Sequence, residues 1–124
     1  MGVEPDKAGE LLDRTAILDR VGGDVEFLDE IAALFAEDCP KLLADIRSAI
    51  AAGNPVGLER AAHTLKGSVA NFGAEAARQA ALRLELLGRS GDLQPAPEAC
   101  TVLEREMERC TTALLALARQ LKLA

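Results

Sequence analysis

The segment LERAAHTLKGSVANF, residues 58–72, contains the single histidine of the chain, His63, within a pattern typical of an amphipathic helix. At about 100° per residue, its apolar residues fall within an arc of about 100°, the width of a stripe that faces a core. These residues are Leu58, Ala61, Ala62, Leu65, Val69 and Phe72. The segment is therefore predicted to be a helix with one buried side.

His63 lies away from this stripe. At about 100° per residue it is roughly 150° from the centre of the stripe, so its imidazole is expected to face solvent. Lys66 and Gly67 follow at the three- and four-residue offsets that place neighbours together on a helix surface. Histidine is commonly both a nucleophile and a proton carrier near pH 7, and an adjacent cation with open space suits an incoming phosphoryl group. An incidental surface histidine is the alternative that this geometry leaves open.

The composition favours packed helices in one domain, residues 1–124. Hydrophobic residues make up 49% of the chain, aromatic residues only 2%, and Trp and Tyr are absent. Such a core of Leu, Ala, Ile and Val is typical of helices. This length can bury a core without disulfides or metals.

The three cysteines, Cys39, Cys100 and Cys110, lack metal-ligand spacing, so no metal site is expected. Cys39 and Cys110 fall on apolar helix positions, where cysteine packs as a small hydrophobic residue.

The charge balance excludes several classes of partner. The chain has 14 Lys and Arg against 20 Asp and Glu, a formal net charge of −6. Without a basic cluster or stacking aromatics, nucleic-acid binding is not expected. No segment has the ~20 apolar residues of a membrane span, and no signal peptide is visible. We therefore expect a soluble, cytoplasmic protein without membrane association.

Breaks in the apolar pattern divide the chain into five expected helices. Glycines at 22–23 and the Gly-Asn-Pro sequence at 53–55 end two of them, and Asp24 is a good N-cap residue. Pro40 removes one hydrogen bond from the second helix and should bend it. The expected helices cover residues 8–20, 24–52, 56–71, 74–89 and 97–121. They predict an all-α fold, an antiparallel up-down-up-down four-helix bundle with a short additional N-terminal helix.

The segment AHTLKGS at 62–68, followed by NFGA at 71–74, resembles the histidine-containing phosphotransfer (Hpt) domain of two-component phosphorelays. The segments at 18–24, 35–43 and 84–92 resemble the same family, so that the likeness runs through nearly the whole chain. The most specific part is the His-x-x-Lys-Gly core inside a predicted bundle. No glycine-rich phosphate loop or other ATP-binding motif accompanies it.

The resemblance implies a phosphorelay intermediate. His63 would accept a phosphoryl group from a receiver-domain phospho-aspartate and pass it to an aspartate of another receiver. Its solvent-facing nitrogen, taken as Nε2, would be the nucleophile, and Lys66 a point charge near the phosphoryl oxygens. Gly67 costs roughly 0.5–1 kcal/mol in a helix interior, and we expect it to leave room for the loops of the partner.

The second ring nitrogen needs a partner that fixes its tautomer. In the family a polar residue on the following helix, often glutamine, can fill this role, and Glu85 stands at the matching position. At about 100° per residue it lies roughly 80–90° off the stripe of its own helix. A carboxylate there would hold the proton on the near nitrogen of His63. Because glutamate departs from the family pattern, a solvent-exposed glutamate is an equally open alternative.

The site is expected to be completed by its partner. No carboxylate cluster surrounds His63, so we expect no cofactor in this chain and Mg²⁺ in the receiver. The chain would then be a monomeric phosphocarrier without an ATPase or kinase centre of its own, and its classification as an enzyme stays open. Response-regulator receiver domains and a hybrid sensor histidine kinase are the implied partners. A free-standing protein and a segment of such a kinase fit the sequence equally.

Two other classes of protein deserve comparison. An autophosphorylating histidine kinase fragment would dimerise and would usually carry a carboxylate directly after the histidine, where Thr64 stands. A plain helical adaptor would make no chemical use of His63.

A small apolar patch for receiver docking is also expected from the first helix. Its crowded apolar residues are Leu11, Leu12, Ile17 and Leu18, some of which should remain exposed beside His63.

Overall fold

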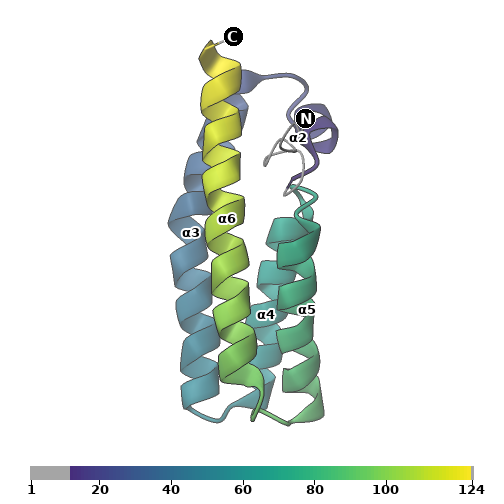
Figure 1. Ribbon diagram of the computed structural model, residues 1–124, viewed down its shortest axis with the longest axis vertical. Coiled ribbons are helices and arrows are strands. Elements are labelled where there is room, and N and C mark those ends of the chain that lie inside the picture. Colours follow the sequence, from purple (N-terminus) through teal and green to yellow (C-terminus); the bar gives the residue numbers. More distant parts are fainter. Residues whose placement is uncertain (1–11, 124) are drawn as a thin grey trace, which may run out of the picture.

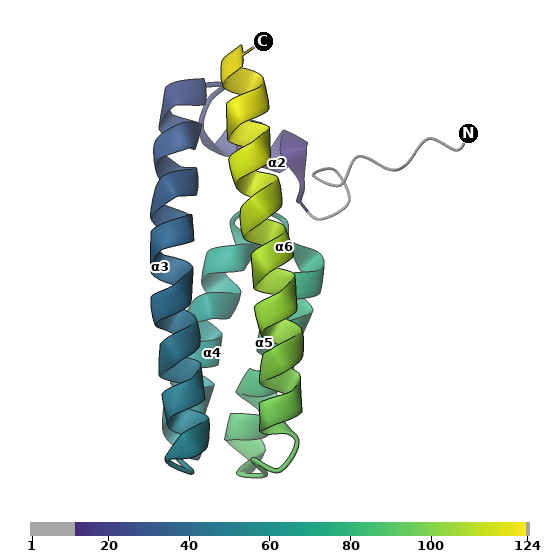
Figure 2. The ribbon, with the colours of Figure 1, turned by 60° about the vertical axis from the view of Figure 1, so that its left-hand side comes forward.

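The structure, a computed structural model, describes residues 12–123, which form helices and no strand (Figure 1). The helices are α2 (Arg14–Arg20), α3 (Val25–Ala51), α4 (Pro55–Ala70), α5 (Glu75–Ser90) and α6 (Ala96–Leu123). The long helices α3 and α6 lie side by side, and α4 and α5 form a shorter hairpin against them (Figures 1 and 2). The prediction of an all-α four-helix bundle with an additional short N-terminal helix is confirmed.

Side-chain caps define the starts of two bundle helices. The carboxylate of Asp24 accepts a hydrogen bond from the Phe27 backbone N–H at 3.1 Å at the start of α3. The side chain of Asn54 does the same for Gly57 at 3.0 Å, with Pro55 at the first position of α4. Both arrangements satisfy N–H groups that a helix start leaves free. Helix α3 continues through Pro40.

The first described helix differs from the expected one. We expected a helix over 8–20, of which residues 8–11 lie outside the described part, but α2 begins only at Arg14. The side chain of Asp13 accepts a hydrogen bond from the Ala16 N–H at 3.0 Å, and its own N–H donates to the Phe72 carbonyl at 3.0 Å. The prediction of a helix running through Asp13 was therefore wrong, because this residue acts as an N-cap and is tied to the turn after α4.

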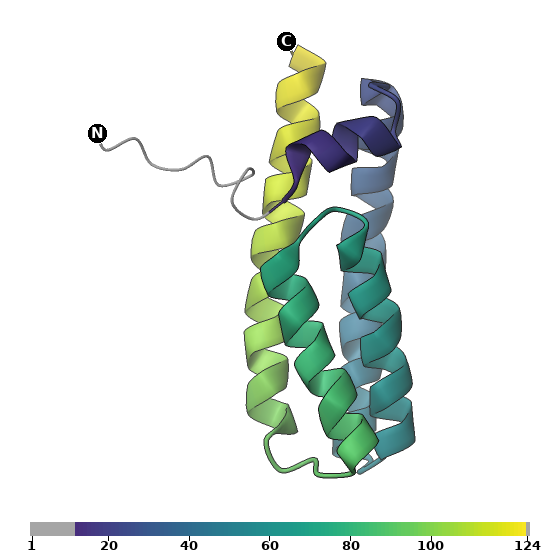
Figure 3. The ribbon, with the colours of Figure 1, turned by 90° about the vertical axis from the view of Figure 1, so that its right-hand side faces the viewer.

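Helix α2 closes one end of the core. It crosses between α6 and α3 beyond the turn that joins α4 and α5 (Figure 3). Leu12 and Ile17 are buried, and Leu18 is half-buried, while Leu11 lies outside the described residues. The apolar side chains of Leu12 and Ile17 thus belong to the core, not to an exposed patch beside His63.

The core consists of side chains from every bundle helix. Its fully buried large residues include Leu28, Ile46, Leu58, Leu65, Leu84, Leu103, Leu114 and Leu117. The rings of Phe35 and Phe72 meet edge to face with centroids 4.8 Å apart.

All three cysteines are buried and free. Burial raises the pKa of Cys39 to about 11 and that of Cys110 to about 12, which leaves both thiols protonated and unreactive near neutral pH.

None of the helices formed by residues 12–123 has an apolar run long enough to cross a membrane.

Candidate functional site

His63 lies on the outer face of α4. Its side chain is 68% exposed, whereas Ala62 and Leu65 on the same helix are fully buried. This is the orientation that the apolar spacing of residues 58–72 predicts. The imidazole is thus held on a packed helix with most of its surface accessible.

Glu85 reaches the histidine from α5. Its side chain is only 4% exposed, and its Oε2 lies 3.2 Å from Nδ1 of His63. The ammonium of Lys66 lies 2.7 Å from Oε1 of the same carboxylate. The alternative of a solvent-exposed glutamate is therefore wrong. The burial of Glu85 brings together three residues that the sequence placed on two different helices.

The Glu85 carboxylate is held in its ionised form. Burial raises the pKa of this carboxyl, but the combined effect of Lys66 and His63 outweighs burial, so the pKa lies below its ordinary value. An ionised carboxylate can only accept hydrogen bonds. In neutral His63 the proton therefore lies on Nδ1, and Nε2 is left unprotonated.

Lys66 and Gly67 occupy the surface next to the imidazole. Lys66 is 23% exposed and is paired with Glu85, so its charge stands beside the ring and is not free in solvent. A Cβ atom added to Gly67 would meet nothing within 4 Å. Gly67 is therefore not needed for packing in the described structure, and the helix face beyond His63 is open.

Two further residues join the site, Arg89 and Glu59. Arg89 donates from Nη2 to Oε2 of Glu85 at 3.0 Å and from Nε to Oε2 of Glu59 at 3.0 Å. The four-residue offset from Glu85 to Arg89 is a signal that sequence reasoning missed. The pair between Arg89 and Glu59 spans 30 residues and depends on how α4 packs against α5.

The histidine opens into a depression of about 650 Å³. Its lining residues are Val56, Glu59, Arg60, His63, Thr64, Glu85 and Arg89. Val56 is an exposed apolar side chain, so that the depression has a partly apolar rim. The depression is wide enough to admit a group carried by another protein.

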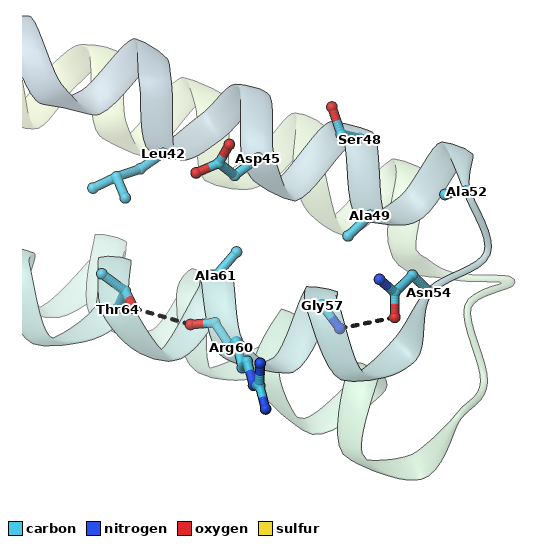
Figure 4. A pocket seen from close by; sticks show the side chains of 10 residues that line it. All are labelled: Leu42, Asp45, Ser48, Ala49, Ala52, Asn54, Gly57, Arg60, Ala61 and Thr64. Atoms are coloured by element: carbon cyan, nitrogen blue, oxygen red, sulfur yellow. Dashed lines mark hydrogen bonds between the residues drawn. The ribbon is translucent and has the colours of Figure 1, made fainter.

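A second hollow lies on the other side of α4. It is a groove of about 550 Å³ between α3 and α4, in which Leu42 and Ala49 of α3 face Ala61 of α4 (Figure 4). Arg60 and Thr64 line both hollows.

Metal-ligating residues do not gather at this site. Within residues 12–123, no group of three or more His, Cys, Asp and Glu side chains is placed to hold a metal ion. The assignment of Mg²⁺ to the partner stays a prediction.

An exposed histidine on a helical bundle, backed by a buried carboxylate and a lysine, defines a histidine phosphotransfer module. The sequence model of the Hpt domain family matches residues 30–117, and the chain belongs to this family. It is thus a histidine-containing phosphotransfer intermediate of phosphorelays, a family whose members interact with receiver domains and kinases.

The fold is also that of a solved Hpt protein. Histidine-containing phosphotransfer protein B (HptB) from Pseudomonas aeruginosa PAO1 superposes with a TM-score of 0.76 at 25% sequence identity, over 95% of each chain. None of the curated protein sequences matches the chain.

Proposed function

We propose that Nε2 of His63 takes a phosphoryl group from the phospho-aspartate of one receiver domain and gives it to an aspartate of another. The observation that carries this assignment is the hydrogen bond from Nδ1 to the buried Glu85 carboxylate. It directs the lone pair of Nε2 to the open side of the site. His63 is also the single histidine of the chain.

The reaction follows from this geometry. The Nε2 lone pair attacks phosphorus while the bond from phosphorus to the aspartyl oxygen breaks, and the aspartate leaves as a carboxylate. The ring, still protonated on Nδ1, gains positive charge as the new N–P bond forms. The negative charge of Glu85 stabilises this charge at a hydrogen-bond distance of 3.2 Å. Transfer onward is the same step in reverse with a different aspartate.

The neighbouring residues have supporting roles in this proposal. Lys66 balances the charge of Glu85, and from its position three residues after His63 on α4 it would attract phosphoryl oxygens. Gly67 leaves the helix surface open for the loops of the receiver, because nothing surrounds its missing side chain. Mg²⁺ would be held by the receiver. We further propose that the protein acts as a monomer in the cytoplasm, without an ATPase centre or a nucleic-acid partner.

The proposal is tested by a complete relay. A receiver charged with labelled acetyl phosphate is incubated with the protein, which is then separated and added to a second, uncharged receiver. We expect label to appear first on this protein and then on the second receiver. A plain helical adaptor would acquire no label from any receiver of a panel, and that outcome would contradict the proposed function. A dimeric mass in solution would favour a kinase fragment over the carrier.

A further inference from the structure

Helix α5 lies close against the main chain of α4 at Gly88. This residue is buried, and a Cβ atom added to it would lie 2.6 Å from the Glu59 nitrogen and 2.7 Å from the Pro55 carbonyl oxygen. The Cα of Glu59 would be 3.0 Å away. Ordinary contacts between carbon atoms begin at about 3.5 Å. Because all of these neighbours are main-chain atoms, no change of rotamer could make room.

The other glycines within the described helices show no such constraint. An added Cβ at Gly67 would be in open space, and one at Gly57 would meet only the side chain of Asn54. A helix-interior glycine costs roughly 0.5–1 kcal/mol relative to alanine. At Gly88 this cost is offset by a backbone-to-backbone contact that no other residue type permits.

The contact lies one helical turn from the proposed phosphoacceptor. Gly88 follows Glu85 by three residues on α5, and Glu59 precedes His63 by four residues on α4. Residues at these offsets lie on the same side of a helix. The spacing of the two helices at Gly88 and Glu59 therefore contributes to the distance between Glu85 and His63.

The hydrogen bond between Nδ1 of His63 and Oε2 of Glu85 tolerates little increase in length. The separation of 3.2 Å between Nδ1 and Oε2 is at the long end of the range for N–H···O hydrogen bonds. An outward shift of several tenths of an ångström would take the pair beyond hydrogen-bond range. The α5 contact at Gly88 thus acts together with the ion pairs of Lys66 with Glu85 and of Arg89 with Glu59 in locating α4 relative to the carboxylate.

We propose that Gly88 is a positioning residue for phosphotransfer. Its missing side chain lets α5 rest on the α4 main chain and thereby keeps the Glu85 carboxylate on Nδ1 of His63. This inference rests on the proposed function, in which Nε2 of His63 is the nucleophile. The role is indirect, since Gly88 contacts neither the imidazole nor the incoming phosphoryl group.

Two readouts on Gly88→Ala test this inference. The first is the ¹⁵N NMR spectrum of the imidazole in alkaline solution, which reports the protonated nitrogen of the unphosphorylated protein. The second is the single-turnover rate of transfer from a charged receiver, measured over a range of receiver concentrations. The matched control is Gly57→Ala, a helical glycine whose added Cβ displaces only the cap side chain of Asn54.

We expect wild type and Gly57→Ala to show the Nδ1-protonated ring and equal transfer rates at saturation. Gly88→Ala should show a mixture of tautomers and transfer roughly 10- to 100-fold more slowly, the cost of misplacing a reacting group by about 1 Å. The receiver concentration at half-saturation should not change. A Gly88→Ala protein with the wild-type tautomer and rate would overturn the inference.

Stability and function are separated in the same experiment. If Gly88→Ala is unfolded in buffer, both measurements are made in sucrose, which favours the compact state. Failure to fold even there would overturn the inference, because the glycine would then serve the whole bundle and not the site. If wild type itself accepts no phosphoryl group, the proposed function fails, while the tautomer spectra still test whether Gly88 positions Glu85.

Discussion

Oε2 of Glu85 lies 3.2 Å from Nδ1 of His63, although the two residues are 22 positions apart and belong to different helices. The carboxylate is buried and the imidazole is exposed. A buried side chain of the bundle thus makes a hydrogen-bond contact with an exposed one. It fixes which nitrogen of the ring faces an incoming phosphoryl group.

Glu85→Gln should preserve the orientation of the ring but weaken its support. The amide oxygen can still accept from Nδ1–H, whereas the negative charge that stabilises the phosphorylated ring is lost. Charge-assisted hydrogen bonds are about twice as strong as neutral ones, so we expect transfer to slow by roughly 5- to 10-fold. Single-turnover transfer from a charged receiver measures this effect. Glu85→Ala should be slower still, and equal rates for both variants would rule out the orienting role.

The stability of the bundle should fall in acid partly through Glu85. Its folded-state pKa lies below the ordinary value of 4.5, so between the two pKa values the unfolded chain binds more protons than the folded one. The contribution is fully present above about pH 4.5 and is lost as the pH falls through the folded pKa. Urea unfolding across this window should show a flatter pH dependence in Glu85→Gln than in wild type. Parallel curves would contradict the shift.

Lys66→Met should destabilise the fold at neutral pH. Removal of the ammonium leaves Oε1 of the buried Glu85 without its cation, and we expect a loss of about 1–3 kcal/mol in the free energy of unfolding. The loss should shrink in acid, where the carboxyl becomes neutral. In the double variant with Glu85→Gln, the cost should be smaller than the sum of the single changes. Strict additivity of the two changes would show that the pair does not interact.

Gly67→Gln should stabilise the fold and at the same time slow phosphotransfer from a receiver. Space around the residue is open, and glutamine is the better helix former, so the free energy of unfolding should rise by about 0.5–1 kcal/mol. Transfer from a receiver should nevertheless slow strongly, because the longer side chain occupies the approach to His63. Phosphorylation by the small donor phosphoramidate should continue. An unchanged rate with the receiver would place Gly67 outside the docking surface.

Helical periodicity alone was sufficient to orient His63 and to predict the bundle. The apolar stripe of residues 58–72 is one-sided, so the direction of the imidazole follows from simple angles. The start of α2 was missed because Asp13 is an N-cap whose backbone also binds the turn at Phe72, a contact between distant segments.

The environment of Glu85 could not be predicted in the same way. Its angle places it on the flank of α5, where burial depends on the spacing of α5 from α4. Gly88 permits a close spacing of these helices, and its contact with the main chain of Glu59 joins residues distant in the sequence. A glycine near a helix end otherwise suggests a C-cap. Sequence patterns describe faces of single helices, whereas the site depends on the distance between two of them.

The central claim is that His63 carries the phosphoryl group, and the comparison of wild type with His63→Gln tests it most directly. Both proteins are incubated with a receiver charged by labelled acetyl phosphate, and the acid and alkali stability of protein-bound label is measured. We predict acid-labile, alkali-stable label on wild type and none on His63→Gln, with equal helix content by circular dichroism because the side chain is 68% exposed. Label of the same kind on His63→Gln, or its absence from wild type, would contradict the account.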